Sequence, residues 1–133
     1  NCYSRQNKFS TSEKSYRASG ITASSITKSR LNIENCYTYY TQFPASYWGN
    51  AISVSNNVLI DHFYSNAGKT YYGTATNTTS SNVSQYDTQY NINSTHVSTF
   101  LNEWIETTGT TRYPQFVFKY WTTAEDGSPC FLN

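Results

Sequence analysis

The chain has 133 residues, a formal net charge of +1, only 13% charged residues and 17% aromatic residues. A chain of this length forms one hydrophobic core, which predicts a single domain over residues 1–133. The balanced charge gives no global electrostatic basis for binding nucleic acid, which is left open as a partner without being favoured. No stretch approaches the ~18 apolar residues of a membrane span, so membrane insertion is not expected.

The first predicted element is a short polar helix over residues 11–19. Ser10 followed by Glu13 matches a capping box, and Gly20 supplies a residue that can end the helix in the left-handed conformation. Both ends of this helix are therefore predicted from capping signals, because its interior is polar.

The middle of the chain is predicted to form strands, because apolar residues recur there with a period of two. Residues 58–64 show the clearest alternation, and residues 65–69 are expected to turn the chain into a partner strand at 70–74. Residues 74–89 are rich in Thr, Ser and Asn, which is typical of a surface loop. Further strands are expected at 36–43, 51–55 and 115–122.

A second, amphipathic helix is predicted over residues 95–107. Asn93 or Ser94 is expected to cap it and Gly109 to end it. Its apolar residues recur at helical spacing: Val97, Phe100, Leu101, Trp104 and Ile105. The order of elements predicts an α+β fold in which an antiparallel sheet packs against this helix, with the short N-terminal helix in addition.

The three cysteines predict one disulfide, between Cys2 and Cys130 at the two ends of the chain. Cys36 is then expected to remain as a buried thiol, since cysteines outside disulfides are among the most buried residues. No spacing typical of a zinc site is present, and neither a metal ion nor another cofactor is expected.

The polar surface composition and three N-glycosylation sequons predict a secreted protein. Asn77, Asn82 and Asn93 each begin an N-x-Ser/Thr motif, and all three fall within seventeen residues. Asn1 as first residue fits removal of a signal peptide.

Catalytic candidates are few, because His62 and His96 are the only imidazoles. Two histidines could supply the base and the acid of phosphodiester cleavage, with Arg112 or Lys119 on the phosphate. Nothing in their spacing brings them together, and a structural role is the favoured interpretation of each.

The aromatic residues point to binding instead. Tyrosines are too numerous for one core of this size, so several are expected at the surface, where flat rings with a polar end suit contact with a protein or a glycan. The expected contact residues are Tyr39, Tyr47, Trp48, Tyr71 and Tyr72. Ordinary solvated strand positions are the alternative interpretation.

The N-terminal segment resembles the fungal secreted ribonucleases of the RNase T1 family. The resemblance rests on Asn1-Cys2-Tyr3-Ser4, on a short helix that carries Tyr16 and ends at Gly20, and on Cys130 as the end-closing cysteine. The family's catalytic His, Glu, Arg and His do not carry over, since Thr41 follows Tyr39-Tyr40 and no Arg-led strand precedes His62. The resemblance therefore implies a member that has lost its active site.

The leading hypothesis is a secreted, effector-like binding protein without enzymatic activity that acts on a host or cell-surface partner. One alternative is a small ribonuclease of the RNase T1 type that uses His62 and His96. The other is a structural subunit of an extracellular filament or coat, which the low charge would suit.

Overall fold

A computed structural model describes the chain in two compact units, Cys2–Gln85 and Tyr86–Asn133, called here the strand unit and the helix unit. The described backbone covers residues 2–8, 18–23, 31–42, 49–54, 58–66, 71–72, 79–86 and 88–133. Side chains are described for residues 32–39, 58–66, 86 and 88–133. The expected single domain stays a prediction, and each unit is described separately.

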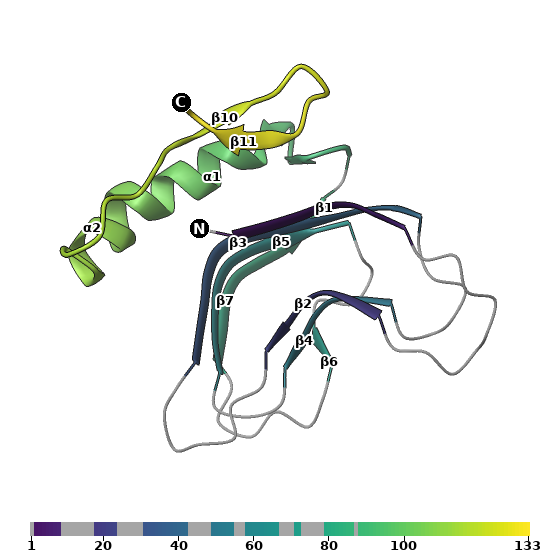
Figure 1. Ribbon diagram of the computed structural model, residues 1–133, viewed down its shortest axis with the longest axis horizontal. Coiled ribbons are helices and arrows are strands. Elements are labelled where there is room, and N and C mark those ends of the chain that lie inside the picture. The colour runs from purple at the N-terminus through teal and green to yellow at the C-terminus, as the bar shows by residue number, and fades with distance from the viewer. Residues whose placement is uncertain are drawn as a thin grey trace. The chain divides into compact units, whose positions relative to one another are not determined.

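The strand unit contains two parallel sheets between which the chain alternates (Figure 1). Odd-numbered strands form one sheet, in the order β1 (Cys2–Lys8), β3 (Leu31–Gln42), β5 (Val58–Ser65) and β7 (Thr79–Gln85). Even-numbered strands form the other: β2 (Ala18–Ala23), β4 (Gly49–Val54) and β6 (Tyr71–Tyr72). Parallel strands that alternate between two sheets are the arrangement of a β-solenoid, in which each coil stacks on the previous one.

Apolar residues of successive coils lie in columns, because parallel pairing in register puts equivalent side chains on the same face of the sheet. The pairs Ile33–Ile60, Cys36–Phe63 and Tyr37–Tyr64 are register partners on β3 and β5, and all six residues are buried. Val83 on β7 continues the Cys36–Phe63 column. In the described part of this unit, the core is thus built by stacking apolar residues of successive coils.

Two residues in the left-handed conformation bend β3 and β5 at equivalent positions. Asn35 has φ 56° and His62 has φ 50°, and each follows one member of the register pair Glu34–Asp61. Asn and His are among the residues that tolerate positive φ best. The bend interrupts the alternation of a flat strand, so that Ile60 and Asp61 are both buried although they are adjacent.

Two predictions for the strand unit are wrong. Residues 58–64 and 70–74 do not form a hairpin, because β5 pairs in parallel with β3 and β7 while β6 pairs with β4. The alternation identified the strand, but it carries no information about which strand is its neighbour. The helix over 11–19 cannot extend to its predicted end, since Ala18 and Ser19 belong to β2, as does the expected stop Gly20; residues 9–17 lie outside the described residues.

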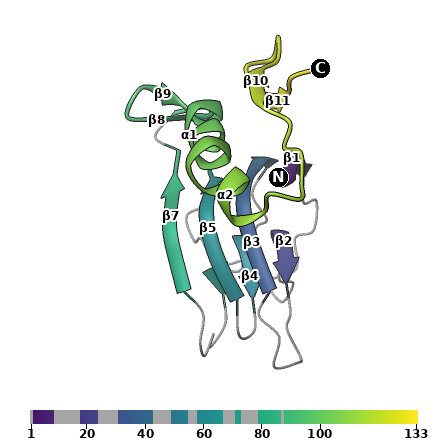
Figure 2. The same ribbon diagram turned by 90° about the vertical axis from the view of Figure 1, so that its left-hand side faces the viewer.

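The polar segment expected to be a loop also contains a strand. Residues 79–85 form β7, which pairs with β5 along most of its length (Figure 2). Its sequence, TSSNVSQ, has a single apolar residue. Its extended conformation is therefore explained by backbone pairing to β5 and not by side-chain pattern.

The helix unit begins with a tight hairpin formed by β8 (Asn91–Ile92) and β9 (Thr95–His96). Its two turn residues, Asn93 and Ser94, have φ 49° and 65°. Positive φ at both central residues is typical of a type I′ turn, the two-residue connection that best matches strand twist. These residues therefore close the hairpin. Neither of them caps the helix, although the sequence predicted that one of them would.

The predicted amphipathic helix is present as one continuous helical segment. It runs through α1 (Val97–Trp104), a π-helical turn η1 (Ile105–Gly109) and α2 (Thr110–Arg112). Of the predicted apolar residues, Val97, Leu101, Trp104 and Ile105 are fully or almost fully buried, whereas Phe100 is half-buried. No helix in the described part of the chain is both long and apolar enough to cross a membrane.

Gly109 does not end the helix, because its backbone is helical with φ −61° and ψ −51°. Instead the six-membered ring of Trp104 lies against it: a Cβ at position 109 would come within 2.5 Å of Trp104 Cζ3. The glycine is thus required by close packing. The backbone N–H of Thr110 donates to Ile105 O, the long hydrogen bond of a π turn, within this segment.

The helix packs on a short antiparallel sheet, β10 (Trp121–Thr123) with β11 (Pro129–Phe131). The Asn102 side chain links the two elements, because its Nδ2 donates to Trp121 O at 3.0 Å and its Oδ1 accepts from Trp121 N at 2.7 Å. The predicted α+β class is therefore confirmed, with antiparallel pairing in the two hairpins of this unit, whereas the two larger sheets are parallel.

Candidate binding surface

The strand predicted at 115–122 forms only at its end, and the residues before it make an exposed apolar surface. Only Trp121 and Thr122 of that range belong to β10; the hairpin's hydrogen bonding reaches one residue further, where Leu132 N donates to Tyr120 O at 2.8 Å. Residues 116–120, called here the apolar segment, lie outside the ladder. The sequence pattern identified their apolar character but not that they lie outside the described ladders.

The apolar segment exposes large side chains to solvent. Val117 is 99% exposed and Phe116 59%, while Tyr120 and the adjacent Leu132 are 42% and 57% exposed. An open hollow of about 330 Å³ lies beside them, lined by Phe116, Val117, Phe118, Lys119 and Phe131. Contiguous exposed apolar groups of this kind are typical of interaction surfaces.

Aromatic packing underneath holds this surface in place. The Phe118 ring contacts the buried Trp104 ring edge to face, with 5.3 Å between ring centroids. The ring centroids of Tyr113 and Phe116 lie 6.3 Å apart. The Phe131 ring packs against the Trp121 ring in a tilted arrangement, with 4.3 Å between ring centroids. Rings anchored in this way lose little conformational entropy on binding, which favours a preformed contact surface.

Of the expected binding residues, only Tyr39 has a described side chain. Tyr39 is half-buried on β3. Tyr71 and Tyr72 form β6, but their side chains lie outside the described residues. Both the backbone and the side chains of Tyr47 and Trp48 lie outside the described residues. Their role stays a prediction, and the surface that the structure shows lies on other aromatic residues.

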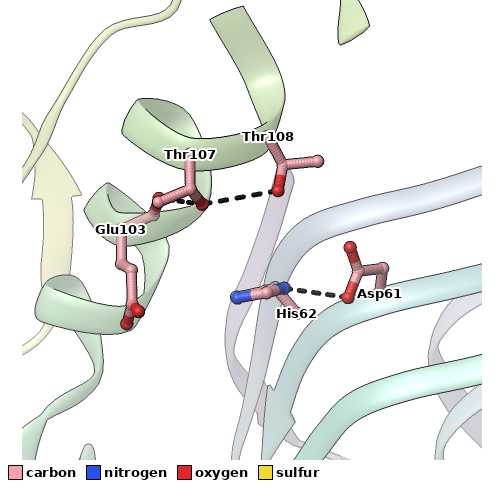
Figure 3. Close-up of polar contacts among 5 residues, drawn as sticks. All are labelled: Asp61, His62, Glu103, Thr107 and Thr108. Atoms are coloured by element: carbon pink, nitrogen blue, oxygen red, sulfur yellow. Dashed lines mark hydrogen bonds and ion pairs between the residues drawn. The ribbon is translucent and has the colours of Figure 1, made fainter. Parts of the chain in front are cut away.

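His62 is engaged by its sequence neighbour. Its Nδ1 lies 2.9 Å from Asp61 Oδ1, and the two side chains are 14% and 9% exposed (Figure 3). This geometry is an imidazole oriented by a carboxylate. It lies at the bend of β5, where His62 adopts positive φ, and a structural role for the residue stays a prediction.

His96 caps the N-terminus of α1. Its Nδ1 accepts from Ser98 N at 3.3 Å and from Ser98 Oγ at 2.7 Å, and its Nε2 donates to Gly127 O at 3.0 Å. Both ring nitrogens are therefore used, and this pattern requires the neutral imidazole with its proton on Nε2. His96 ties the helix to the turn of the β10–β11 hairpin.

We expect His96→Ala to lower the free energy of unfolding of the helix unit by about 1 kcal/mol, the usual cost of losing an N-cap acceptor. His96→Asn should lose less, because the Asn side chain can still accept from Ser98 N. Urea unfolding of both variants measures the difference. Equal losses would show that the cap bond does not contribute.

The residues of the ribonuclease alternative are divided between the two units. His62 belongs to the strand unit, whereas His96 and the exposed Arg112 and Lys119 belong to the helix unit. Within neither unit do two imidazoles and a cation form one site. Figure 3 also shows two contacts that lie within the helical segment and do not involve His62. Thr107 Oγ1 donates to Glu103 O at 2.7 Å and lies 3.4 Å from Thr108 Oγ1.

Cys130 is not disulfide-bonded in this structure, and the Cys2–Cys130 disulfide stays a prediction. Cys130 lies in β11, where its register partner is Thr122. Cys36 is buried and not disulfide-bonded, as predicted, and its Sγ donates to Glu34 O at 3.1 Å. No group of three or more His, Cys, Asp or Glu side chains in the described part of the chain could hold a metal ion.

The three sequons occupy different settings. Asn93 is exposed at the tip of the β8–β9 hairpin, and Asn82 lies within β7. Asn77 lies outside the described residues. Glycosylation stays a prediction at each of them, with Asn93 the position whose exposed turn would accommodate a glycan without disturbing the core.

Comparison with protein-family models, curated proteins and solved structures finds no match to this chain. The resemblance to the RNase T1 family therefore stays a prediction.

Proposed function

We propose that this chain is a secreted, non-enzymatic binding protein that contacts its partner through the apolar segment, residues 116–120, together with Leu132. The observation that carries the proposal is the nearly complete exposure of Val117 beside three other exposed large apolar side chains. An isolated exposed apolar residue is ordinary, but a contiguous set beside a hollow is a feature of contact surfaces.

The chemistry of this surface favours a protein partner over a glycan. Sugars stack on flat aromatic faces, whereas the most exposed residue here is the aliphatic Val117 and Leu132 adds a second aliphatic group. Aliphatic and aromatic side chains beside a hollow fit the apolar side chains of another protein. Lys119, which lines the hollow, adds one positive charge that favours a neighbouring acidic residue on the partner.

The inventory of polar groups supports binding over catalysis. Of the two imidazoles, His96 uses both nitrogens to hold the helix and the hairpin together, and His62 is oriented by Asp61 at a strand bend. General acid–base catalysis requires groups that can reach a substrate and exchange protons with it. The contacts of both histidines support a structural role for each of them.

A library of short random peptides displayed on phage tests the proposal, with the purified chain as bait. Peptides rich in apolar residues should be selected and should bind Val117→Asp at least ten-fold more weakly, since one buried unpaired charge costs more than the 1.4 kcal/mol that a factor of ten represents. Val117 is so exposed that the substitution should leave folding unchanged.

Gln115→Asp is the matched control, because it adds the same charge at an exposed neighbouring position outside the hollow. Peptides that bind this variant as weakly as Val117→Asp would show that net charge is responsible. Selected peptides that bind both variants as well as the unaltered chain would contradict the proposed surface. Cleavage of RNA that disappears in His62→Ala or His96→Ala would replace the proposal with the ribonuclease alternative.

A further inference from the structure

The parallel pairing of β1 with β3 places Cys2 opposite Cys36. The two residues are register partners in the ladder, followed by the pairs Tyr3–Tyr37 and Ser4–Thr38. Neighbouring strands lie about 4.8 Å apart. Disulfides join residues whose Cα atoms are about 4.4–6.8 Å apart, so the strand pairing alone brings these two cysteines within bonding range.

We propose that Cys2 and Cys36 form a cross-strand disulfide when the chain is exposed to an oxidising compartment, and that Cys130 remains a thiol. The register carries the proposal, because it places the backbones of these two residues opposite each other on neighbouring strands. Cys130 has Thr122 as its register partner, so its ladder offers it no second cysteine.

The surroundings of Cys36 suit a buried bond. Cys36 is 3% exposed and occupies the column that continues to the fully buried Phe63. Its thiol donates to Glu34 O within the same strand. Oxidation replaces that weak sulfur hydrogen bond by a covalent bond in an apolar column, and it adds no polar group to the core.

The oxidation requires a low-molecular-weight disulfide such as oxidised glutathione. One cysteine thiolate attacks the oxidant, which forms a mixed disulfide and releases one glutathione thiolate. The thiolate of the second cysteine then attacks the protein sulfur of the mixed disulfide, which forms the Cys2–Cys36 bond and releases the second glutathione. Two protons leave the protein thiols, and two electrons reduce the oxidant.

A bond at this position would connect the first strand of the odd-numbered sheet to the next coil. β1 has one described neighbour, β3, so its pairing is the interface that opens first when the ladder frays from that edge. The disulfide would hold that edge in register. We therefore expect slower amide hydrogen exchange in β1 of the oxidised protein than in the reduced protein.

Peptide mapping tests the inference. The folded chain is equilibrated with a mixture of reduced and oxidised glutathione, its remaining thiols are alkylated, and the digest is analysed by mass spectrometry. We expect one linked peptide pair that contains Cys2 and Cys36, and alkylation at Cys130 alone. Cys130→Ser should keep the link, and Cys36→Ser should abolish it.

Oxidation in concentrated urea is the control, because urea removes the strand pairing. If pairing directs the bond, the yield of the Cys2–Cys36 link should be several-fold higher in the folded protein. Three alkylated thiols, a link to Cys130, or an equal yield in urea would each overturn the inference. The Cys130→Ser variant keeps the test informative if Cys36→Ser fails to fold.

Discussion

Trp104→Ala should lower the free energy of unfolding of the helix unit by about 3–5 kcal/mol, the range measured when a large buried aromatic is truncated. Trp104 is only 1% exposed, and its ring contacts Phe118 edge to face and lies 6.4 Å from Tyr113. Removing it would leave a cavity beneath the apolar segment, because both rings that rest on it lose their support. Urea unfolding followed by far-UV circular dichroism measures the loss.

Trp104→Phe separates the ring's packing from its polar group. Within the described residues Trp104 Nε1 has no hydrogen-bond partner, so removal of this N–H costs no hydrogen bond. We therefore expect Trp104→Phe to lose less than half as much as Trp104→Ala. Tyr120→Ala is the control for an exposed aromatic, at 42% exposure. A loss below about 1 kcal/mol for Trp104→Ala would contradict the packing described.

Gly109→Ala should destabilise the helix unit by about 3 kcal/mol, the upper end of the usual cost of overpacking. The added methyl group would lie 2.5 Å from Trp104 Cζ3, and 3.0 Å from Cε3 of the same rigid ring. Helix propensity predicts the opposite sign, because Ala is favoured over Gly in a helix interior by about 1 kcal/mol. The sign of the measured change therefore distinguishes close packing from propensity.

Two further variants test this explanation of Gly109. Gly127→Ala is the control for glycine flexibility: its φ is +80° and nothing lies within 4 Å of an added Cβ, so its cost is conformational and about 1 kcal/mol. Combining Gly109→Ala with Trp104→Ala should give a loss well below the sum of the two, because the second substitution removes the clash. Additive losses would refute the contact.

The helix was predictable because its signal is local. Apolar residues at helical spacing require only neighbours along the chain, and their periodicity indicated all four buried residues, Val97, Leu101, Trp104 and Ile105, together with the half-buried Phe100. Its boundaries were less predictable. Asn93 and Ser94 favour a turn as readily as a cap, and only the pairing of β8 with β9 decides between the two.

The parallel sheets were not predictable from pattern. Alternation identifies a strand such as β5, but the choice between a hairpin partner and a strand one coil away depends on contacts distant in sequence. The polar β7 shows this most clearly, since only its backbone pairing with β5 makes it a strand. The cysteine pair that we propose differs from the predicted one for the same reason, because end positions suggested Cys130 whereas the ladder places Cys36 opposite Cys2.

The sequence by itself determined the α+β class, the position and buried face of the main helix, and the burial of Cys36, because composition and local periodicity control these features. The tertiary structure decided the parallel order of the strands, the cap at His96, the close contact at Gly109 and the exposure of Val117. Each of these depends on which distant segment is adjacent in space. The local sequence does not predict the exposure of Val117 or the contact between Gly109 and the Trp104 ring, because both depend on how elements pack in space.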